Sequence, residues 1–129
     1  CGALRSDYQK TRVERMCERL GLLSFTPLWH HQAEQHMVEL VDHGFDIMLT
    51  SVSAEGLGHE WVGTQLDSDA LERLRILSTT HRFNVDGEGG EFETAVVAAP
   101  WMDGAIEMKC SRHSRGVRHW LQIEHSEVV

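Results

Sequence analysis

The feature that most constrains the fold is the order of helical and extended patterns in the first fifty residues. Residues 6–20 repeat apolar side chains at helical spacing, and residues 22–29 read as a short extended stretch. A second helical pattern covers residues 32–43, and the apolar run at 45–52 is typical of a buried strand. This alternation favours a parallel sheet with crossover helices. We therefore expect residues 1–52 to belong to a parallel α/β sheet.

Local signals mark where these elements begin and end. Ser6 and Gln9 fit a capping box at the start of the first helix, and Gly21 is a suitable stop. Gly44 ends the second helical pattern in the same way. The chain begins at Cys1 and not at Met. We expect a processed product, a shortened chain or a fragment, whose first residues are the tail of a preceding strand.

The second half has a different pattern, which predicts a smaller α+β domain at residues 53–129. A third helix is expected at residues 67–81, followed by strands at 94–99, 105–111 and 116–124. In the last of these, apolar and polar side chains alternate, as they do in a half-exposed antiparallel strand. The predicted fold class is therefore α/β, with the end of a parallel sheet followed by an α+β domain.

Composition and charge exclude several classes of function. The net charge of −8 argues against general nucleic-acid binding, because phosphate binding requires clustered Lys and Arg. No apolar run approaches the roughly 18 residues that span a bilayer, so no membrane partner is expected. The three cysteines form neither a disulfide framework nor a C-x-x-C motif, which favours a reducing, cytoplasmic location. The nine histidines lack metal-ligand spacing, so no metal site is expected.

The segment Gly87-Glu-Gly-Gly-Glu91 is the strongest functional signal. Its glycines let the backbone turn sharply and approach a ligand, and successive N–H groups there could form an anion-binding nest. Glu88 and Glu91 are candidate catalytic carboxylates, which could bind ammonium or act as a general base. A solvated acidic loop is the alternative that composition leaves open. The candidate binding glycines are Gly87, Gly89 and Gly90.

Two further segments are candidates for ligand binding. Glu55 and Gly56 follow the strand expected at 45–52, and ligands of open α/β sheets lie beyond the carboxyl ends of strands. The start of the first helix could hold an anion. A plain connecting loop and a simple capping box are the competing explanations. The candidate residues at the helix start are Ser6, Asp7 and Tyr8.

Tryptophans outside the periodic elements are candidate ring contacts. Trp29 and Trp61 lie in connections that contain proline or glycine. Aromatic faces near carboxylates suit a cationic or planar group. Core packing is the competing explanation for each of them.

Five motifs in order resemble the diphthine–ammonia ligase family. The similarity runs from Cys1 to about Pro100, and the last thirty residues match only as a pattern of strands. The motifs are Cys1-Gly-Ala-Leu-Arg-Ser-Asp-Tyr-Gln9, Thr26-Pro-Leu-Trp29, Ser53-Ala-Glu-Gly-Leu-Gly58, Trp61-Val-Gly63 and Gly87-Glu-Gly-Gly-Glu-Phe-Glu-Thr94.

The resemblance implies an ATP pyrophosphatase of the adenine-nucleotide α-hydrolase type. Residues 1–52 would be the remaining part of its Rossmann-like domain, and residues 53–129 would be its substrate-side domain. ATP with Mg²⁺ would activate the carboxylate of diphthine on elongation factor 2 as an acyl-adenylate, with release of pyrophosphate. Ammonia would then displace AMP and leave the amide. The resemblance leaves open whether the protein forms a homodimer.

This chain departs from the family pattern in one respect. The Ser-Gly-Gly-Lys-Asp-Ser loop, which binds phosphates at a helix N-terminus, is absent. We therefore expect a C-terminal part that is inactive by itself. By the resemblance, Glu88 and Glu91 are the first candidates to act on ammonium or the acyl-adenylate, and Glu55 is the next candidate. Trp29 or Trp61 would contact the trimethylammonium group of diphthine.

Two other functions stay open. A related ATP pyrophosphatase would act on another carboxylate or on a tRNA base, since a fold does not fix a function. A non-catalytic binding module would dock a protein partner, which the absent phosphate loop favours.

Overall fold

The computed structural model describes every residue from 1 to 129, and these form two compact units, Cys1–Gln32 and Ala33–Val129. The sequence analysis placed a domain boundary between residues 52 and 53. The division that the structure shows lies earlier in the chain. The strand expected at residues 45–52 therefore belongs to the second unit.

The first unit contains one helix, α1 (Asp7–Arg19). Ser6 is its N-cap, and the Ser6 Oγ accepts a hydrogen bond from the N–H of Gln9 at 3.3 Å. At the other end Gly21 has a φ of 65°, and the N–H of Leu22 donates to the carbonyl of Cys17 at 2.8 Å. This is the Schellman pattern of helix termination. Both predicted ends of the helix are confirmed.

The extended stretch expected at residues 22–29 is not a strand. The N–H of Trp29 donates to the carbonyl of Thr26 at 3.2 Å, and the N–H of His31 donates to that of Leu28 at 2.9 Å. The chain therefore makes successive turns here. Pro27 lies within the first turn, and proline lacks the N–H that a sheet ladder requires.

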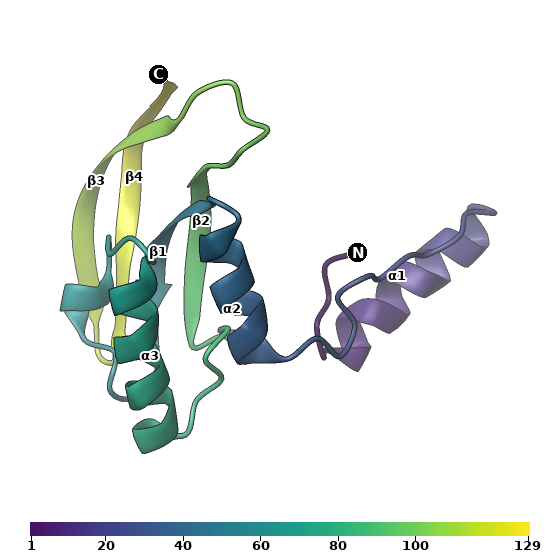
Figure 1. Cartoon of the computed structure of the whole chain (residues 1–129), viewed down its shortest axis with the longest axis horizontal. Helices are drawn as coiled ribbons and strands as arrows, with labels where there is room; N and C mark the ends of the chain where they lie inside the picture. The colour runs from purple at the N-terminus through teal and green to yellow at the C-terminus, as the bar shows by residue number, and fades with distance from the viewer. The chain divides into compact units, whose positions relative to one another are not determined.

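The second unit is built on a four-stranded antiparallel sheet (Figure 1). The spatial order is β2-β1-β4-β3, and every neighbouring pair runs antiparallel. The α/β class is confirmed, but the predicted parallel, Rossmann-like sheet is not present in this chain. The strands are β1 (Asp46–Val52), β2 (Phe92–Ala98), β3 (Ile106–Arg115) and β4 (Arg118–Val128).

The direction of β2 follows from an extra passage of the chain along β1. After β1 the segment Gly63–Leu66 runs back beside it, and the N–H of Leu66 donates to the carbonyl of Ile47 at 2.8 Å. Helix α3 (Ser68–His81) then returns the chain toward the end of β1. As a result β2 begins where β1 ends, with Phe92 opposite Val52. A simple crossover from β1 to β2, without the return along Gly63–Leu66, would have made these two strands parallel.

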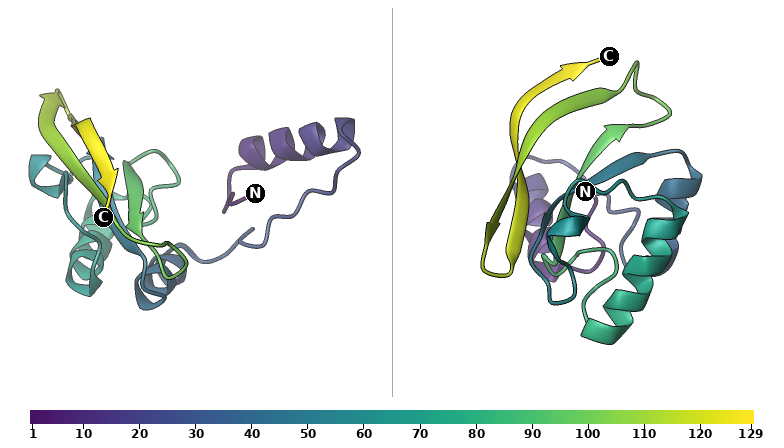
Figure 2. Two further views of the ribbon diagram at one scale, coloured as in Figure 1. Left: turned by 90° about the horizontal axis from the view of Figure 1, so that it is seen from above. Right: turned by 90° about the vertical axis from the view of Figure 1, so that its left-hand side faces the viewer.

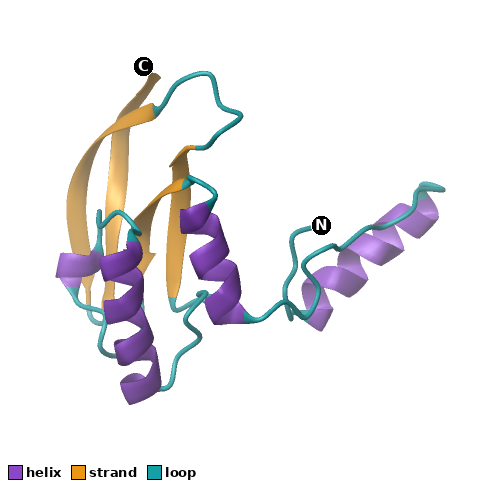
Figure 3. Cartoon of the chain, in the orientation of Figure 1, coloured by secondary structure: helices purple, strands orange, loops and turns teal.

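Helices α2 (Ala33–Asp42) and α3 lie side by side on one face of the sheet, as Figures 1, 2 and 3 show. A short 3-10 helix, η1 (His59–Trp61), precedes the Gly63–Leu66 segment. The core lies between the helices and the sheet, where Leu49, Val52 and Leu74 are 0% exposed. No helix of the chain combines the length and apolarity that crossing a membrane requires.

The ends of α3 and the antiparallel hairpin of β3 and β4 agree with the sequence. Asp67 caps α3, and its Oδ1 accepts a hydrogen bond from the N–H of Ala70 at 2.8 Å. The two strands pair from Ile106 opposite Val128 down to the turn, so the hairpin is longer than predicted. Gly116, with a φ of 61°, occupies the first turn position, where two-residue hairpins favour glycine.

Replacing Leu74 with alanine should destabilise the chain strongly. Its side chain is fully buried, so the change removes apolar contacts and leaves a cavity. We expect Leu74→Ala to lower the free energy of unfolding by about 2–5 kcal/mol in urea denaturation. Ile76→Ala is the matched control on the same helix, since Ile76 is 53% exposed. Equal losses in the two variants would contradict the position of the core.

Candidate functional site

The end of β1 and the start of β2 bring two predicted segments together. We call Ser53–Gly58, after β1, the facing loop, and Asp86–Glu91, before β2, the carboxylate loop. The N–H of Ser53 donates to the carbonyl of Glu91 at 2.8 Å. The Ser53 hydroxyl donates to the carbonyl of Gly90, also at 2.8 Å. The two loops are therefore joined at one end of the sheet.

Glu91 is the most constrained carboxylate of this site. Its Oε1 accepts hydrogen bonds from the backbone N–H of Asn84 at 2.9 Å and from the Asn84 side-chain amide at 2.8 Å. Its Oε2 is buried and has no hydrogen-bond partner. Leaving a buried acceptor without a donor costs free energy. An ammonium group is a donor of suitable charge and size for this oxygen.

The glycines of the carboxylate loop are required by its geometry. Gly87 and Gly90 have φ values of 71° and 83°, in the left-handed region that favours glycine. A Cβ on Gly89 would lie 2.5 Å from the Oε1 of Glu91. Any side chain at Gly89 would therefore displace the carboxylate that Asn84 holds.

The predicted anion-binding nest is not available in this conformation, because loop N–H groups already have acceptors. The N–H of Gly87 donates to the carbonyl of Asn84 at 3.0 Å, and that of Gly90 donates to the carbonyl of Gly87 at 2.9 Å. The N–H of Glu88 donates to the Oδ1 of Asp86 at 3.3 Å. The carboxylate loop thus presents acidic side chains and few free donors. It suits a cation and not a phosphate.

The carboxylate loop has few features of a phosphate or metal site. The loop N–H groups of Gly87, Glu88 and Gly90 have acceptors, and no group of three His, Cys, Asp or Glu side chains is placed to hold a metal ion. Glu88 is half-buried, and its carboxylate makes no ion pair.

The facing loop places Glu55 beside a histidine at the end of α3. The Glu55 side chain is 89% exposed, and its Oε1 lies 3.8 Å from the Nδ1 of His81. Gly56 has a φ of 87°, and a Cβ there would lie 2.3 Å from the Cδ2 of His81. The absence of a side chain at Gly56 therefore lets the imidazole pack against the loop.

Trp61 lies in the core. Its side chain is 2% exposed, and the Arg73 guanidinium lies over its ring at 4.7 Å from the centroid. A substrate cation would have to displace Arg73 and open the core to reach the ring. This position fits the competing explanation of core packing.

The remaining predicted residues lie in the first unit. Ser6 is engaged in capping α1, and the exposed Tyr8 accepts a hydrogen bond from Arg12 at 3.0 Å. Trp29 is half-buried, and the Lys10 ammonium lies 5.3 Å from its ring centroid. The Trp29 ring therefore already binds an ammonium group of this chain. The residues in this unit are Ser6, Asp7, Tyr8 and Trp29.

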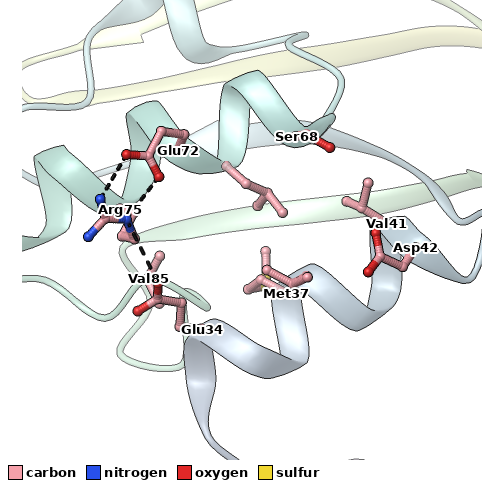
Figure 4. Close-up of a pocket in the computed structure, with 10 residues that line it drawn as sticks. Glu34, Met37, Val41, Asp42, Ser68, Glu72, Arg75 and Val85 are labelled. Carbon is pink, nitrogen blue, oxygen red and sulfur yellow. Dashed lines mark hydrogen bonds and ion pairs between the residues drawn. The ribbon is translucent and has the colours of Figure 1, made fainter.

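A separate groove of about 180 Å³ lies between α2 and α3 (Figure 4). Its floor is apolar, with Met37 and Val41 from α2. At its rim Arg75 donates to Glu72 at 2.7 and 2.9 Å and lies 3.8 Å from Glu34. The hydrogen bonds from Arg75 lower the pKa of the Glu72 carboxyl, and Glu72 raises the pKa of Arg75. None of the residues predicted from the sequence lines this groove.

Sequence reasoning missed two residues of the site, Asn84 and His81. Asn84 had a detectable signal, because Asn-Val-Asp-Gly has the Asx and Gly positions typical of a type I turn. Its amide contact with Glu91 could not be read from spacing alone. His81 had no signal, since it meets the facing loop only through the packing of α3.

Comparison with known proteins identifies relatives along the chain. Residues 32–129 match the diphthamide synthase C-terminal domain family. A protein named diphthine–ammonia ligase from Schizosaccharomyces pombe is 34% identical over 126 residues, which cover 95% of this chain and 21% of the relative. The Saccharomyces cerevisiae protein of the same name is 35% identical over 85% of this chain and 19% of its own length. The Homo sapiens protein of that name is 38% identical over 101 residues, which cover 77% of this chain and 37% of the relative. The chain thus spans about a fifth of the fungal relatives and just over a third of the human one.

The packing of His81 against Gly56 can be tested with two alanine variants. Gly56→Ala and Gly90→Ala both force a left-handed backbone on alanine, which should cost each about 1 kcal/mol of stability. Only at Gly56 does the new Cβ meet another side chain. We expect Gly56→Ala to lose roughly 1 kcal/mol more in thermal unfolding and to shift the His81 ring resonances. Identical behaviour of the two variants would contradict this contact.

Proposed function

Because this chain belongs to the diphthamide synthase C-terminal domain family, we propose that it forms part of an ATP-dependent diphthine–ammonia ligase. In the overall reaction, the carboxylate of diphthine on elongation factor 2, ammonia and ATP give the amide, AMP and pyrophosphate. Such a reaction on a translation factor would take place in the cytoplasm. The main support is the match of residues 32–129 together with relatives of that name at 34–38% identity.

The carboxylate loop would bind the ammonium that supplies the amide nitrogen. Glu91 is the first candidate, because its buried Oε2 lacks a donor while Asn84 fixes the other oxygen. Glu88 would add negative charge from the same loop. Glu55, beside His81, is the third candidate carboxylate.

The first unit would complete a Rossmann-like domain that binds the nucleotide. Its apolar side chains support this role, because Leu20, Leu22, Leu23 and Phe25 are all at least 59% exposed. Contiguous exposed apolar surface is typical of an interface with further protein. The capped start of α1 at Ser6 and the Trp29 ring would then face substrate or nucleotide.

The ligase assignment predicts that this chain can replace the matching segment of a relative. We expect a chimera of the S. pombe ligase that carries residues 1–129 to restore diphthamide on elongation factor 2 in cells without the native ligase, measured by mass spectrometry. A chimera with the matching human segment is the control. If the human chimera works and this one is stable but inactive, the ligase assignment is wrong.

Glu91→Gln should weaken the use of ammonia in an active chimera. The substitution keeps the shape of the side chain but removes the charge that would bind ammonium. We expect the KM for ammonium to rise roughly tenfold, in line with the loss of one charge-assisted hydrogen bond. Glu124→Gln, on the exposed part of β4, should leave KM unchanged. An unaltered ammonium KM in Glu91→Gln would remove this residue from the ammonia site.

A further inference from the structure

The charge of the chain is strongly segregated. The segment Lys109–Ile123, which we call the basic hairpin, contains four Lys or Arg residues and no Asp or Glu. Because the whole chain has a net charge of −8, the residues outside the hairpin sum to −12. Nearly the whole hairpin is regular β-structure of β3 and β4. Its four cations are Lys109, Arg112, Arg115 and Arg118.

These four cations have no acidic partner within the chain. All four side chains are exposed, and none forms an ion pair with a carboxylate. Arg115 lies directly opposite Arg118 at the turn. Like charges opposite each other across two strands are destabilising. The arrangement therefore lowers the stability of the hairpin unless an anion neutralises it.

The outer face of the hairpin combines two of these charges, Arg115 and Arg118, with stacked rings. Cross-strand pairs share a face, so Trp120 and His113 lie with the Arg115–Arg118 pair. The His113 and Trp120 rings stack with centroids 5.6 Å apart, and Arg118 lies 5.5 Å from the Trp120 ring centroid. Leu121 points the other way and packs against the core. The cationic, aromatic face is thus turned away from the helices.

Protection of an edge strand does not explain this pattern. β3 is an edge of the sheet, and charges on edge strands prevent aggregation. Such protection concerns only the edge strand, on which Lys109, Arg112 and Arg115 lie. Arg118 and Trp120 lie on β4, which is not an edge strand.

The hairpin face continues toward the carboxylate loop. Trp120 lies opposite Ser51 of β1, and Ser51 lies opposite Glu93 of β2. These residues therefore share the open face of the sheet with His113. Glu93 follows the carboxylate loop by two residues. A macromolecule bound to the hairpin would place its neighbouring surface at the site that Glu91 defines.

We propose that the outer face of the basic hairpin docks an acidic segment of the protein that carries diphthine. This inference rests on the proposed function, which supplies a protein substrate. Within the second unit the cationic surface is confined to this hairpin, because the other residues of 33–129 (three Arg against 17 Asp or Glu) sum to −14. It therefore fits a short acidic segment better than an extended nucleic acid, whose phosphates continue beyond the hairpin.

The test uses an active chimera that carries residues 1–129, together with its protein substrate. We expect Arg115→Glu with Arg118→Glu to raise the KM for the diphthine-bearing protein roughly tenfold, with kcat unchanged, and to flatten the salt dependence of KM. Arg73→Glu with Arg75→Glu changes the net charge equally on the exposed surface of α3 and should change KM less than about twofold. Equal KM values for the hairpin variant and the wild type would overturn the proposal.

A single substitution separates docking from stability. Arg118→Glu turns the repulsive pair with Arg115 into an attractive one, so the melting temperature should rise by roughly 1–4 °C while KM for the protein substrate increases. A parallel fall in melting temperature and activity would mean that the arginines are structural, and would overturn docking.

Two further outcomes distinguish failure of the proposed function from failure of the docking proposal. A wild-type protein without activity on the diphthine-bearing substrate would refute the proposed function itself. An active wild type, whose hairpin variant keeps its KM but loses affinity for a single-stranded RNA oligonucleotide, would refute the acidic protein segment. In that case the occupant is a nucleic acid.

Discussion

The second unit depends on the hydrogen bonding of both edges of β1. One edge pairs along its length with β2, and the other is shared between β4 and the returning Gly63–Leu66 segment. Leu49 and Val52 are fully buried as a result, and both helices pack over this strand. The same pairing brings the facing loop and the carboxylate loop together. The geometry of the site is therefore a consequence of where β1 lies.

The elements could be predicted from sequence because their signals are local. The caps at Ser6 and Asp67, the stop at Gly21 and the apolar period of α3 depend on residues a few positions apart. The direction of β2 could not be predicted in this way. It depends on the Gly63–Leu66 segment, which is too short and irregular to read as an element. Alternation of helix and strand signals therefore predicted a parallel sheet that the chain does not form.

The arrangement of the candidate site could be predicted in part for the same reason. The glycine-rich motif identified Glu91 and its loop, because unusual backbone requirements are visible in composition. The acceptors that occupy the loop N–H groups, and the Asn84 amide that fixes Glu91, are set by the turn before β2. Trp61 looked like a loop residue, yet η1 turns its side chain into the core. The direction of a side chain in an irregular segment cannot be read from a periodic sequence pattern, because such patterns hold only in regular helices and strands.

The narrow attachment of β4 to β1 divides the sheet into two cooperative parts. Only two residue pairs, Ser51 with Trp120 and Val52 with His119, join the hairpin to the central strand, whereas β3 and β4 pair along their whole length. Local opening follows the number of contacts that must break. Apart from the packing of Leu121 against the core, few contacts would have to break for the hairpin to open before the layer of helices. Its outer amides should exchange with solvent deuterium well before those of β1, and a bound partner would slow that exchange.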